Sequence, residues 1–487
     1  MRLSIRTLSA LSAVVFGLSG CLLGPNYQRP AVDTPQSFRF PDNEASDLVN
    51  AEWWKQFDDP VLNDLIVAAL AGNKDVKIAA ARVDQFLGQF WSTRSQLLPQ
   101  ASAGFDAARQ RATQAGPTPV FSNAGPIFND FQGSLAASWE IDLFGRNRRL
   151  TESARANLLA TEEGRRATIL SLVASVASSY ITLLSLDRQL EIAKATTASR
   201  AESVHVFQLR FSGGEVSQME LAQSQSEYEA SRATIPQLET QIAQQEDALS
   251  VLLGRNPGPI LRGRDLAALH TPAVPAGLPS ELLERRPDLR QAEQSLIAAN
   301  ALIGAARALY FPSISLTSLI GTESGQFSRL FAGPGRVWAF AGSFAQPVFT
   351  GGNIAGQVKQ AQAQQQEALL SYQKAIQVAF QEVDDALIVS QKRREQLGIL
   401  ERQVDALRTY SRMARLRYEG GYTSYIEVLD AERSLFNAEL SHTQTKAAVF
   451  TSYVALYKSM GGGWVVDAEK LATQPAETAT ESRRAPP

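Results

Sequence analysis

The second half of the chain repeats the first, and this duplication limits the possible folds more than any other feature of the sequence. The segment Arg210-Phe211-Ser212-Gly213-Gly214 returns 207 positions later as Arg417-Tyr418-Glu419-Gly420-Gly421. The same offset aligns Met219-Glu220-Leu221 with Ile426-Glu427-Val428. A fixed offset of this kind predicts two structural repeats that share one plan.

Each half reads as a helix, a pair of strands, a very long helix, a Gly-Gly turn and a returning long helix. Proline-rich sequence between the halves predicts a linker, and a final stretch rich in Ala, Thr, Glu and Pro predicts a disordered tail. The expected bounds are 61–255 for the first repeat, with a β-hairpin at about 99–141 and a helical hairpin at about 145–253, then 256–280 for the linker, 281–464 for the second repeat, with a β-hairpin at about 312–348 and a helical hairpin at about 353–460, and 465–487 for the tail.

The long helices carry an apolar seven-residue repeat, which is typical of coiled coils. In the last helix the apolar positions advance by alternating steps of three and four from Ile426 to Tyr457. A helix from Gly145 to Phe211 would contain 67 residues and would extend ~100 Å at 1.5 Å per residue. Such a helix is not an ordinary globular element, since the mean helix has about 11–12 residues. Pro236 lies inside one long helix and is expected to kink or break it.

The strand candidates alternate with a period of two. In the segment from Val337 to Phe344, the large side chains Trp338, Phe340 and Phe344 fall on one face and small residues on the other. Ser313 to Thr317 alternates as clearly. Large apolar residues outside and small polar residues inside are typical of a transmembrane barrel strand, although a half-buried sheet in a soluble domain shows the same alternation.

About four such strands per chain predict a trimer. Four strands leave two open edges, which lipid does not tolerate because their backbone groups would be unpaired. Two chains would give a barrel of about eight strands, filled by its own side chains. Three chains would give about twelve strands and leave a lumen, so closure together with a long hollow helical bundle favours three copies.

The start of the chain predicts a secretory signal at 1–20. Arg2 and Arg6 supply a positive end, and a short apolar run from Leu8 to Leu18 follows, too short to span a bilayer. The alternative is a buried N-terminal helix. No later segment has about 18 consecutive apolar residues, so we expect any spanning part to be a β-barrel.

Cys21, the sole cysteine of the chain, directly follows the small pair Ser19-Gly20. This arrangement resembles the bacterial lipobox and implies cleavage before Cys21 and attachment of lipid to it. An extended lipidated segment is then expected at 21–60. Leu22 stands next in place of Asp, which in enteric-type sorting implies export to the outer membrane.

The composition and the missing motifs argue against several classes of function. A net charge of -2 gives no general attraction to nucleic acid. No two of His205, His270 and His442 lie within one helical turn of each other, so the sequence shows no histidine metal cluster, and one cysteine allows no intrachain disulfide. The sequence contains no phosphate-binding loop, serine-nucleophile elbow or zinc-binding His-Glu-x-x-His pair. We therefore expect no enzyme, no metal and no cofactor apart from the lipid.

A periplasmic coiled-coil adaptor is the main alternative to a channel. Such adaptors are also often lipidated, but they would contain one helical hairpin flanked by lipoyl-like and β-barrel-like segments. The hairpin occurs twice in this sequence, each time after a pair of strands, which favours the channel.

Several separate motifs then match one family, in the right order. These are Gly24-Pro25-Asn26-Tyr27, Trp53-Trp54-Lys55-Gln56-Phe57, Trp139-Glu140-Ile141-Asp142-Leu143-Phe144-Gly145, Arg285-Arg286-Pro287-Asp288-Leu289 and Gly461-Gly462-Gly463-Trp464. From about residue 18 to 464 the chain resembles the outer-membrane factors of tripartite export systems, the TolC/OprM family, in its lipidated branch.

This resemblance implies an α+β membrane protein in which three protomers build a twelve-stranded transmembrane β-barrel. The barrel would continue into a twelve-helix coiled-coil barrel in the periplasm, surrounded by a mixed equatorial domain. It also implies a channel for passive passage of small molecules across the outer membrane of a Gram-negative bacterium. A periplasmic adaptor and an inner-membrane pump, of the RND type for the lipidated branch, would be its partners. The cargo, the adaptor and an ABC or MFS pump in place of an RND pump remain open.

The resemblance places a gate at the helix tips. Tyr418 matches a tyrosine that helps hold the closed tip, and Asp430 matches an aspartate that rings the pore. Ile426 matches an apolar constriction, and Glu427 matches a second acidic position used by some members. Thr423 stands where some members carry a latching arginine.

Physical alternatives exist for each of these positions. Three copies of Asp430 would form a carboxylate ring that attracts cations, and a ring of Ile426 would seal by dewetting. Asp430 could equally be a solvated flank of the coil, and Ile426 could be packed in its seam. The corresponding first-half residues are Phe211, Met219, Glu220 and Gln223.

The Gly-Gly turns would face the adaptor. Glycine at these positions also fits simple helix punctuation with positive φ. The four residues concerned are Gly213, Gly214, Gly420 and Gly421.

Overall fold

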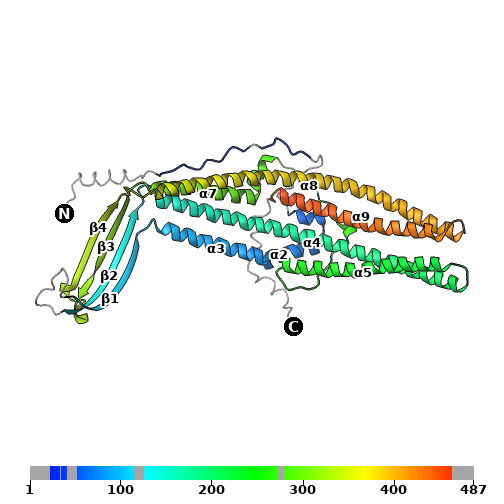
Figure 1. The fold of residues 1–487 in the computed structure, drawn as a ribbon, viewed down its shortest axis with the longest axis horizontal. Coiled ribbons are helices and arrows are strands. Elements are labelled where there is room, and N and C mark those ends of the chain that lie inside the picture. The colour runs from blue at the N-terminus through cyan, green and yellow to red at the C-terminus, as the bar shows by residue number, and fades with distance from the viewer. Residues whose placement is uncertain (1–21, 33, 41–51, 114–125, 273–278, 463–487) are drawn as a thin grey trace, which may run out of the picture. The chain divides into compact units, whose positions relative to one another are not determined.

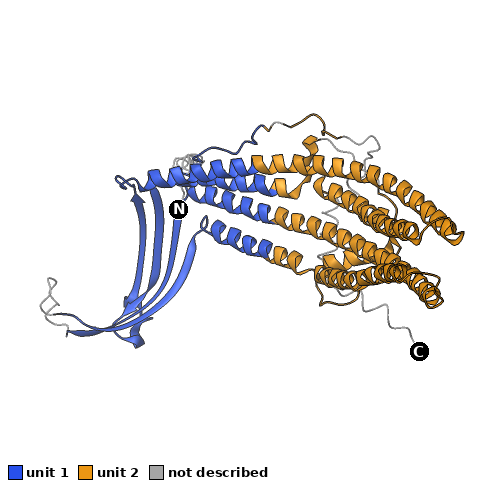
Figure 2. Cartoon of the chain, turned by 45° about the vertical axis from the view of Figure 1, so that its right-hand side comes forward, with its two compact units in different colours: residues 1–31, 82–161, 291–372 blue, residues 32–81, 162–290, 373–487 orange. Residues whose placement is uncertain are grey.

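A computed structural model describes residues 22–32, 34–40, 52–113, 126–272 and 279–462 (Figure 1). The expected signal and tail, Cys21 and part of the segment 21–60 lie outside these residues. The chain divides into two compact units, 1–31 with 82–161 and 291–372, and 32–81 with 162–290 and 373–487 (Figure 2). Each unit takes segments from both halves, so the duplication runs through both units.

Corresponding helices in the two halves have equal lengths. The first helices have 22 residues, the long helices 67 and the returning helices 35. In the first half these are α3 (Lys74–Ser95), α4 (Arg146–Ser212) and α5 (Gln218–Leu252), and in the second half α7 (Pro287–Ala308), α8 (Asn353–Glu419) and α9 (Tyr425–Ser459). Equal lengths mean that the turns of the two repeats fall at equivalent positions.

The break expected at Pro236 is absent. Helix α5 runs without interruption from Gln218 to Leu252, with Pro236 inside it. Nearby hydroxyl groups bond to backbone carbonyls, with Thr234 Oγ1 donating to Ser231 O at 2.7 Å. Packing on both sides of the proline holds the helix together, since Leu238 is buried in an apolar cluster with Phe436.

One four-stranded antiparallel sheet has the order β1-β2-β3-β4, so its edges are β1 and β4. Its register aligns Leu135, Ile320 and Trp338 in one row across three strands. Because side chains alternate along strands, most of the large apolar residues share one face, and the other face carries mainly small and polar residues. The strands are β1 (Gln100–Arg111), β2 (Ile127–Ile141), β3 (Ser313–Ser324) and β4 (Arg336–Ala345).

The apolar face of this sheet is not covered by other parts of the described chain. Trp338 is 72% exposed, and Phe340 and Phe344 are each 68% exposed. An aromatic surface of this kind is unfavourable in water and marks an interaction with a partner or a membrane. It fits the expected contact with lipid.

The main core lies where two short elements, η1 (Trp53–Phe57) and α2 (Pro60–Gly72), pack against the long helices. Trp53 is fully buried and stacks on Tyr457 with ring centroids 5.3 Å apart. Within the described residues, α4 is the one helix that is long and apolar enough to cross a membrane when judged by length and composition alone. Of that apolar window 72% is buried, as in the core helix of a packed bundle.

The linker between the repeats is clamped to this core. Asp59 is fully buried and accepts hydrogen bonds from Tyr180 Oη at 2.8 Å and from the backbone N–H of Arg264 at 3.0 Å. Arg262 pairs with Asp187 at 2.9 Å and also with Glu246. These contacts fix the described part of the linker although it lacks long regular elements.

Candidate functional site

The two helix tips have the same backbone geometry. In the first, Glu215 N donates to Arg210 O at 2.9 Å, and in the second Tyr422 N donates to Arg417 O at 2.8 Å. Gly214 has φ +77° and Gly421 has φ +73°. A hypothetical Cβ on either glycine would meet no atom within 4 Å. Glycine is therefore favoured here by its left-handed conformation, which closes a helix C-terminus.

The returning helices begin differently. Ser217 and Glu220 form a reciprocal capping box at the start of α5, which satisfies two otherwise free donors. Ser424 makes no side-chain cap at the start of α9. Glu427 is the residue of the second repeat that corresponds to Glu220. Its carboxylate accepts hydrogen bonds from Thr423 Oγ1 and, at 3.3 Å, from Arg417 Nη1. The second tip is thus held by a charged side-chain network in place of a cap.

Three aromatic rings join the two helical hairpins next to the turns. Phe207 on α4 and Tyr425 on α9 are buried, with centroids 4.1 Å apart. Tyr418 on α8 lies 5.2 Å from Tyr425 and stacks 6.2 Å from Phe207. We call these residues the tip cluster. Ring pairs at such separations are favourable beyond the area that they bury, so the cluster ties the first repeat to the second.

Arg210 on α4 adds a polar contact between the repeats at the exposed side of the tip cluster. Its Nη1 donates to Tyr418 Oη at 3.2 Å, and its guanidinium carbon lies 5.9 Å from the centre of the Tyr418 ring. Burial raises the pKa of Tyr425 above its ordinary value, and the negative charge of Glu432 also raises that pKa. Tyr425 therefore stays neutral, as its position among apolar rings requires.

The other expected gate residues stand outside the tip cluster. Ile426 is 59% exposed and so is not packed in the seam between α8 and α9 within one chain. Asp430 is also exposed and pairs with Arg433 at 2.8 Å. Since Ile426 and Asp430 are four residues apart on α9, they lie on the same side of this helix.

Sequence reasoning found Tyr418 but missed Phe207, Tyr425 and Arg210. A residue-by-residue comparison of the repeats contains the signal, because Phe207 corresponds to Ala414 and Tyr425 corresponds to Gln218. At each of these two positions one repeat has an aromatic ring and the other repeat has a small or polar residue. The exchange allows rings from different repeats to meet at a single place.

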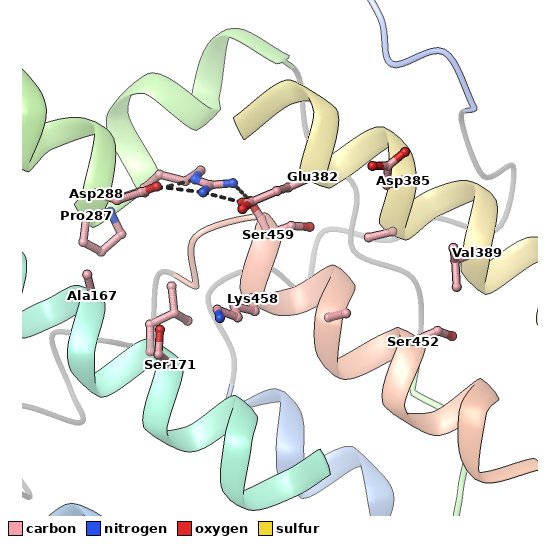
Figure 3. Close-up of a pocket in the computed structure, with 14 residues that line it drawn as sticks. Ala167, Ser171, Pro287, Asp288, Glu382, Asp385, Val389, Ser452, Lys458 and Ser459 are labelled. Carbon is pink, nitrogen blue, oxygen red and sulfur yellow. Dashed lines mark hydrogen bonds and ion pairs between the residues drawn. The ribbon is translucent and has the colours of Figure 1, made fainter. Parts of the chain in front are cut away.

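A second candidate region surrounds Arg286 of the Arg-Arg-Pro-Asp motif. Arg286 is buried and pairs with Asp288 at 2.7 Å and with Glu382 at 2.6 Å (Figure 3). It also donates to Ser459 O at 3.1 Å. These bonds border a recess of about 550 Å³ in which Lys458 is exposed. They connect α8 and the end of α9 to the start of α7, which gives the motif a structural role.

No group of three or more His, Cys, Asp or Glu side chains suited to a metal ion occurs in the described part of the chain. The residue expected to carry lipid, Cys21, is outside that part.

Comparison with known proteins identifies the family. The model of the outer membrane efflux protein family matches residues 65–255 and 278–462. The toluene efflux pump outer membrane protein TtgC of Pseudomonas putida is 36% identical over 471 residues, covering 94% of this chain and 96% of TtgC. The cation efflux system protein CusC of Escherichia coli is also 36% identical, over 93% of this chain and 97% of CusC. The open-state structure of the Neisseria gonorrhoeae outer membrane channel MtrE aligns with a TM-score of 0.82 and 32% identity, over 91% of this chain and 99% of MtrE.

These matches confirm the resemblance and the expected fold. The four-stranded sheet is one third of a twelve-stranded barrel that three protomers close in the outer membrane, and the helices project into the periplasm. Channels of this family act with a periplasmic adaptor and an inner-membrane pump. The chain belongs to the outer membrane efflux protein family and is the outer-membrane channel of an efflux system.

Proposed function

We propose that the helix tips are the gate of this channel and that the tip cluster holds the gate closed. The observation that carries the proposal is the contact of Phe207, Tyr418 and Tyr425 across the two repeats, next to the turns. Opening then requires the α8–α9 hairpin to move away from α4. The charged contact from Arg210 to Tyr418 stabilises the closed arrangement further.

In the closed trimer, Ile426 and Asp430 point towards the threefold axis. Three Ile426 side chains form an apolar constriction that excludes water, and three Asp430 carboxylates form a ring that attracts cations. The exposure of both side chains supports this arrangement. The pairing of Asp430 with Arg433 lowers the net charge of the ring without removing its carboxylates.

The proposal also names partners, and the position of the turns at the ends of the long helices supports an adaptor contact there. Gly213, Gly214, Gly420 and Gly421 contact the periplasmic adaptor, and the open surroundings of Gly214 and Gly421 favour a backbone contact at these two positions. The inner-membrane pump is of the RND type, and Cys21 carries a covalent lipid. We assign the protein transport without catalysis, in line with a family of channels.

The cargo does not follow from similarity. TtgC is named for toluene and CusC for cations, yet both are 36% identical to this chain. Equal identity to two relatives with different named cargoes gives no preference for either.

Conductance in planar bilayers tests the gate, with the repeat equivalents as matched controls. Ile426→Ala and Asp430→Ala are each expected to raise the closed-state conductance several-fold, and Asp430→Ala is also expected to weaken block by divalent cations. Met219→Ala and Gln223→Ala change the corresponding first-half positions and are expected to leave both properties unchanged. Unchanged conductance and cation block in the α9 variants would remove these residues from the gate.

A further inference from the structure

Four arginines gather at the outer end of the sheet. Arg111 pairs with Ile127 at the last position of the β1–β2 ladder, and Arg336 pairs with Thr322 at the last position of the β3–β4 ladder. Arg109 lies two residues before Arg111 on β1, so the two side chains are on the same face, and Arg329 lies in the turn between β3 and β4. The helices continue from the opposite ends of these strands (Figure 1). Because the helices enter the periplasm, the arginines are at the extracellular end.

Three of these arginines are on the face that contacts lipid. The register places Ala103, Leu135, Ile320 and Trp338 in one row. Counting by twos from this row puts Arg109, Arg111 and Arg336 on the same face as Trp338. All three side chains are exposed.

The carboxylates of this half of the sheet are on the opposite face. The same counting places Asp106, Asp130 and Glu323 towards the lumen. The sequence of the two turns, 112–126 and 325–335, contains no Asp or Glu. Among the described residues, none of the four arginine guanidinium groups forms an ion pair or hydrogen bond.

Aromatic rings lie beside the arginines. Phe327, in the same short turn as Arg329, packs edge-on against Phe105 at 6.2 Å and Phe131 at 5.7 Å. Phe105 and Phe131 are on the lipid-facing side by the same register. Phe327 remains 62% exposed, and Phe331, which follows it, is 83% exposed. The surface therefore combines unpaired cations with apolar rings at the height of the membrane interface, where amphipathic lipids present their headgroups.

We propose that this surface binds the phosphorylated glycolipid of the outer leaflet. Arg109, Arg111 and Arg336 contact its phosphates, and Phe327 and Phe331 contact the upper part of its acyl chains. Guanidinium groups bind phosphate through paired hydrogen bonds, and the lack of carboxylates on this face leaves the arginines available. The proposal rests on the outer-membrane location and does not depend on the gate.

Closure of the barrel completes the site. Arg109 and Arg111 are on one edge strand of the sheet, and Arg336 is on the other. When three sheets close into a barrel, β1 of one protomer lies beside β4 of the next. Each of the three seams then brings arginines from two protomers to one glycolipid, which would also link adjacent protomers.

The test is binding of lipid A, with two phosphates on its diglucosamine headgroup, to the purified trimer by native mass spectrometry. EDTA is included so that divalent cations cannot bridge phosphates to carboxylates. The triple variant Arg109→Gln/Arg111→Gln/Arg336→Gln is expected to bind at least tenfold more weakly than the unmodified protein. The control Arg94→Gln/Arg307→Gln/Lys359→Gln removes the same charge near the periplasmic ends of the strands and is expected to bind within twofold.

Comparison probes identify the ligand. Dephosphorylated lipid A and zwitterionic phosphatidylethanolamine are expected to bind at least tenfold more weakly than lipid A. Equal binding of either lipid, or inorganic phosphate binding as tightly as lipid A, would overturn the proposal. Equal lipid A binding by the triple variant and the unmodified trimer would also overturn it.

If the triple variant does not assemble into a trimer, lipid A binding is measured on the three single variants. At least one of Arg109→Gln, Arg111→Gln and Arg336→Gln is then expected to weaken lipid A binding threefold or more. Unchanged binding in all three would overturn the proposal. Bilayer conductance in these variants is expected to equal that of the unmodified channel, which separates lipid binding from gating.

Discussion

At the scale of single residues, the contact between the two repeats at the tip depends on which ring points inward. Phe207 is 3% exposed and is in contact with both tyrosines of the tip cluster, whereas Phe211, one turn later on α4, is 38% exposed. Both are phenylalanines near the end of one helix. Replacing each of them by alanine removes the same ring, so a difference between the two variants reports the packing of Phe207 in the tip cluster.

Phe207→Ala is expected to weaken the tip by roughly 3–5 kcal/mol, because it removes a buried ring and leaves a cavity. The loss should appear as faster hydrogen exchange in 203–222 and 414–430 and as a raised closed-state conductance. Phe211→Ala is the matched control and is expected to change either property little. Equal effects of the two substitutions would mean that the tip cluster does not hold the tip.

The residues of this cluster also show what the sequence could and could not predict. Tyr418 was found because its segment repeats Phe211 and its neighbours and matches a family position. Phe207 and Tyr425 stand where the repeats differ, so they are not among the matching residues that identified the tip, and only their differences from Ala414 and Gln218 point to them. Three-dimensional packing between repeats is needed to see why the two differences occur together.

At the scale of elements, the sequence predicted the long helices and the place of the linker, but not the contacts that order the linker. Heptad periodicity and glycine turns gave helices within a residue or two of α4 and α8, because both signals are local along the chain. The linker has no periodicity, and its order comes from distant partners such as Asp59, Asp187 and Glu246. Pro236 does not break α5, one of the two outcomes expected for it, because tertiary packing outweighs the local cost of a proline.

The linker clamp is expected to weaken in acid. Burial tends to raise the pKa of Glu246, but the hydrogen bond from Arg262, the N–H of Ile260 and the charge of Arg262 outweigh burial and lower this pKa below its ordinary value of 4.5. A lowered pKa means that the clamp is at full strength above about pH 4.5 and is lost as the pH falls through the folded-state value. Proteolysis of the segment 256–268 should therefore accelerate below this pH.

Glu246→Gln tests the assignment. This variant is expected to be cleaved faster at neutral pH and to lose the acid dependence of the linker. Glu239→Gln changes an exposed glutamate on the same helix, paired with Lys194, and is expected to behave like the unmodified protein. An unaltered acid dependence in Glu246→Gln would assign the titration to another group.

The two faces of the sheet give a prediction at the same scale. Phe340 faces lipid and its neighbour Ala339 faces the lumen, by the register with β3. A lysine on the lipid face of a barrel costs roughly 2–4 kcal/mol at the bilayer midplane, so Phe340→Lys should lower trimer stability by about that amount. Ala339→Lys adds the same charge to the lumen and is expected to be tolerated. The fraction of heat-resistant trimer on gels measures both, and a reversed order would mean that the faces are assigned wrongly.

At the scale of the whole molecule, the protein functions only as a closed tube. The sheet has two open edges in one chain, β1 and β4, and lipid requires that both be paired. The requirement for three copies was visible in the sequence as four short strands, because edge pairing is a general constraint. That constraint does not fix the position of a gate, and our proposal for its position rests on the contacts of the tip cluster.

If the tips are the gate, a covalent link between the repeats should stop transport. Arg210→Cys and Tyr418→Cys together replace a hydrogen-bonded pair, and the chain has no cysteine other than Cys21, which we propose to be lipidated. Without a cross-linking reagent this double variant is expected to leak, because both the charged contact and one ring are lost. A short bifunctional methanethiosulfonate, which forms a disulfide with each of the two thiols, should then lower bilayer conductance at least tenfold, and a reductant that cleaves these disulfides should restore it. Each single cysteine variant, treated in the same way, should be unaffected. Cross-linked trimers that conduct as well as reduced ones would place the rate-limiting constriction away from the helix tips.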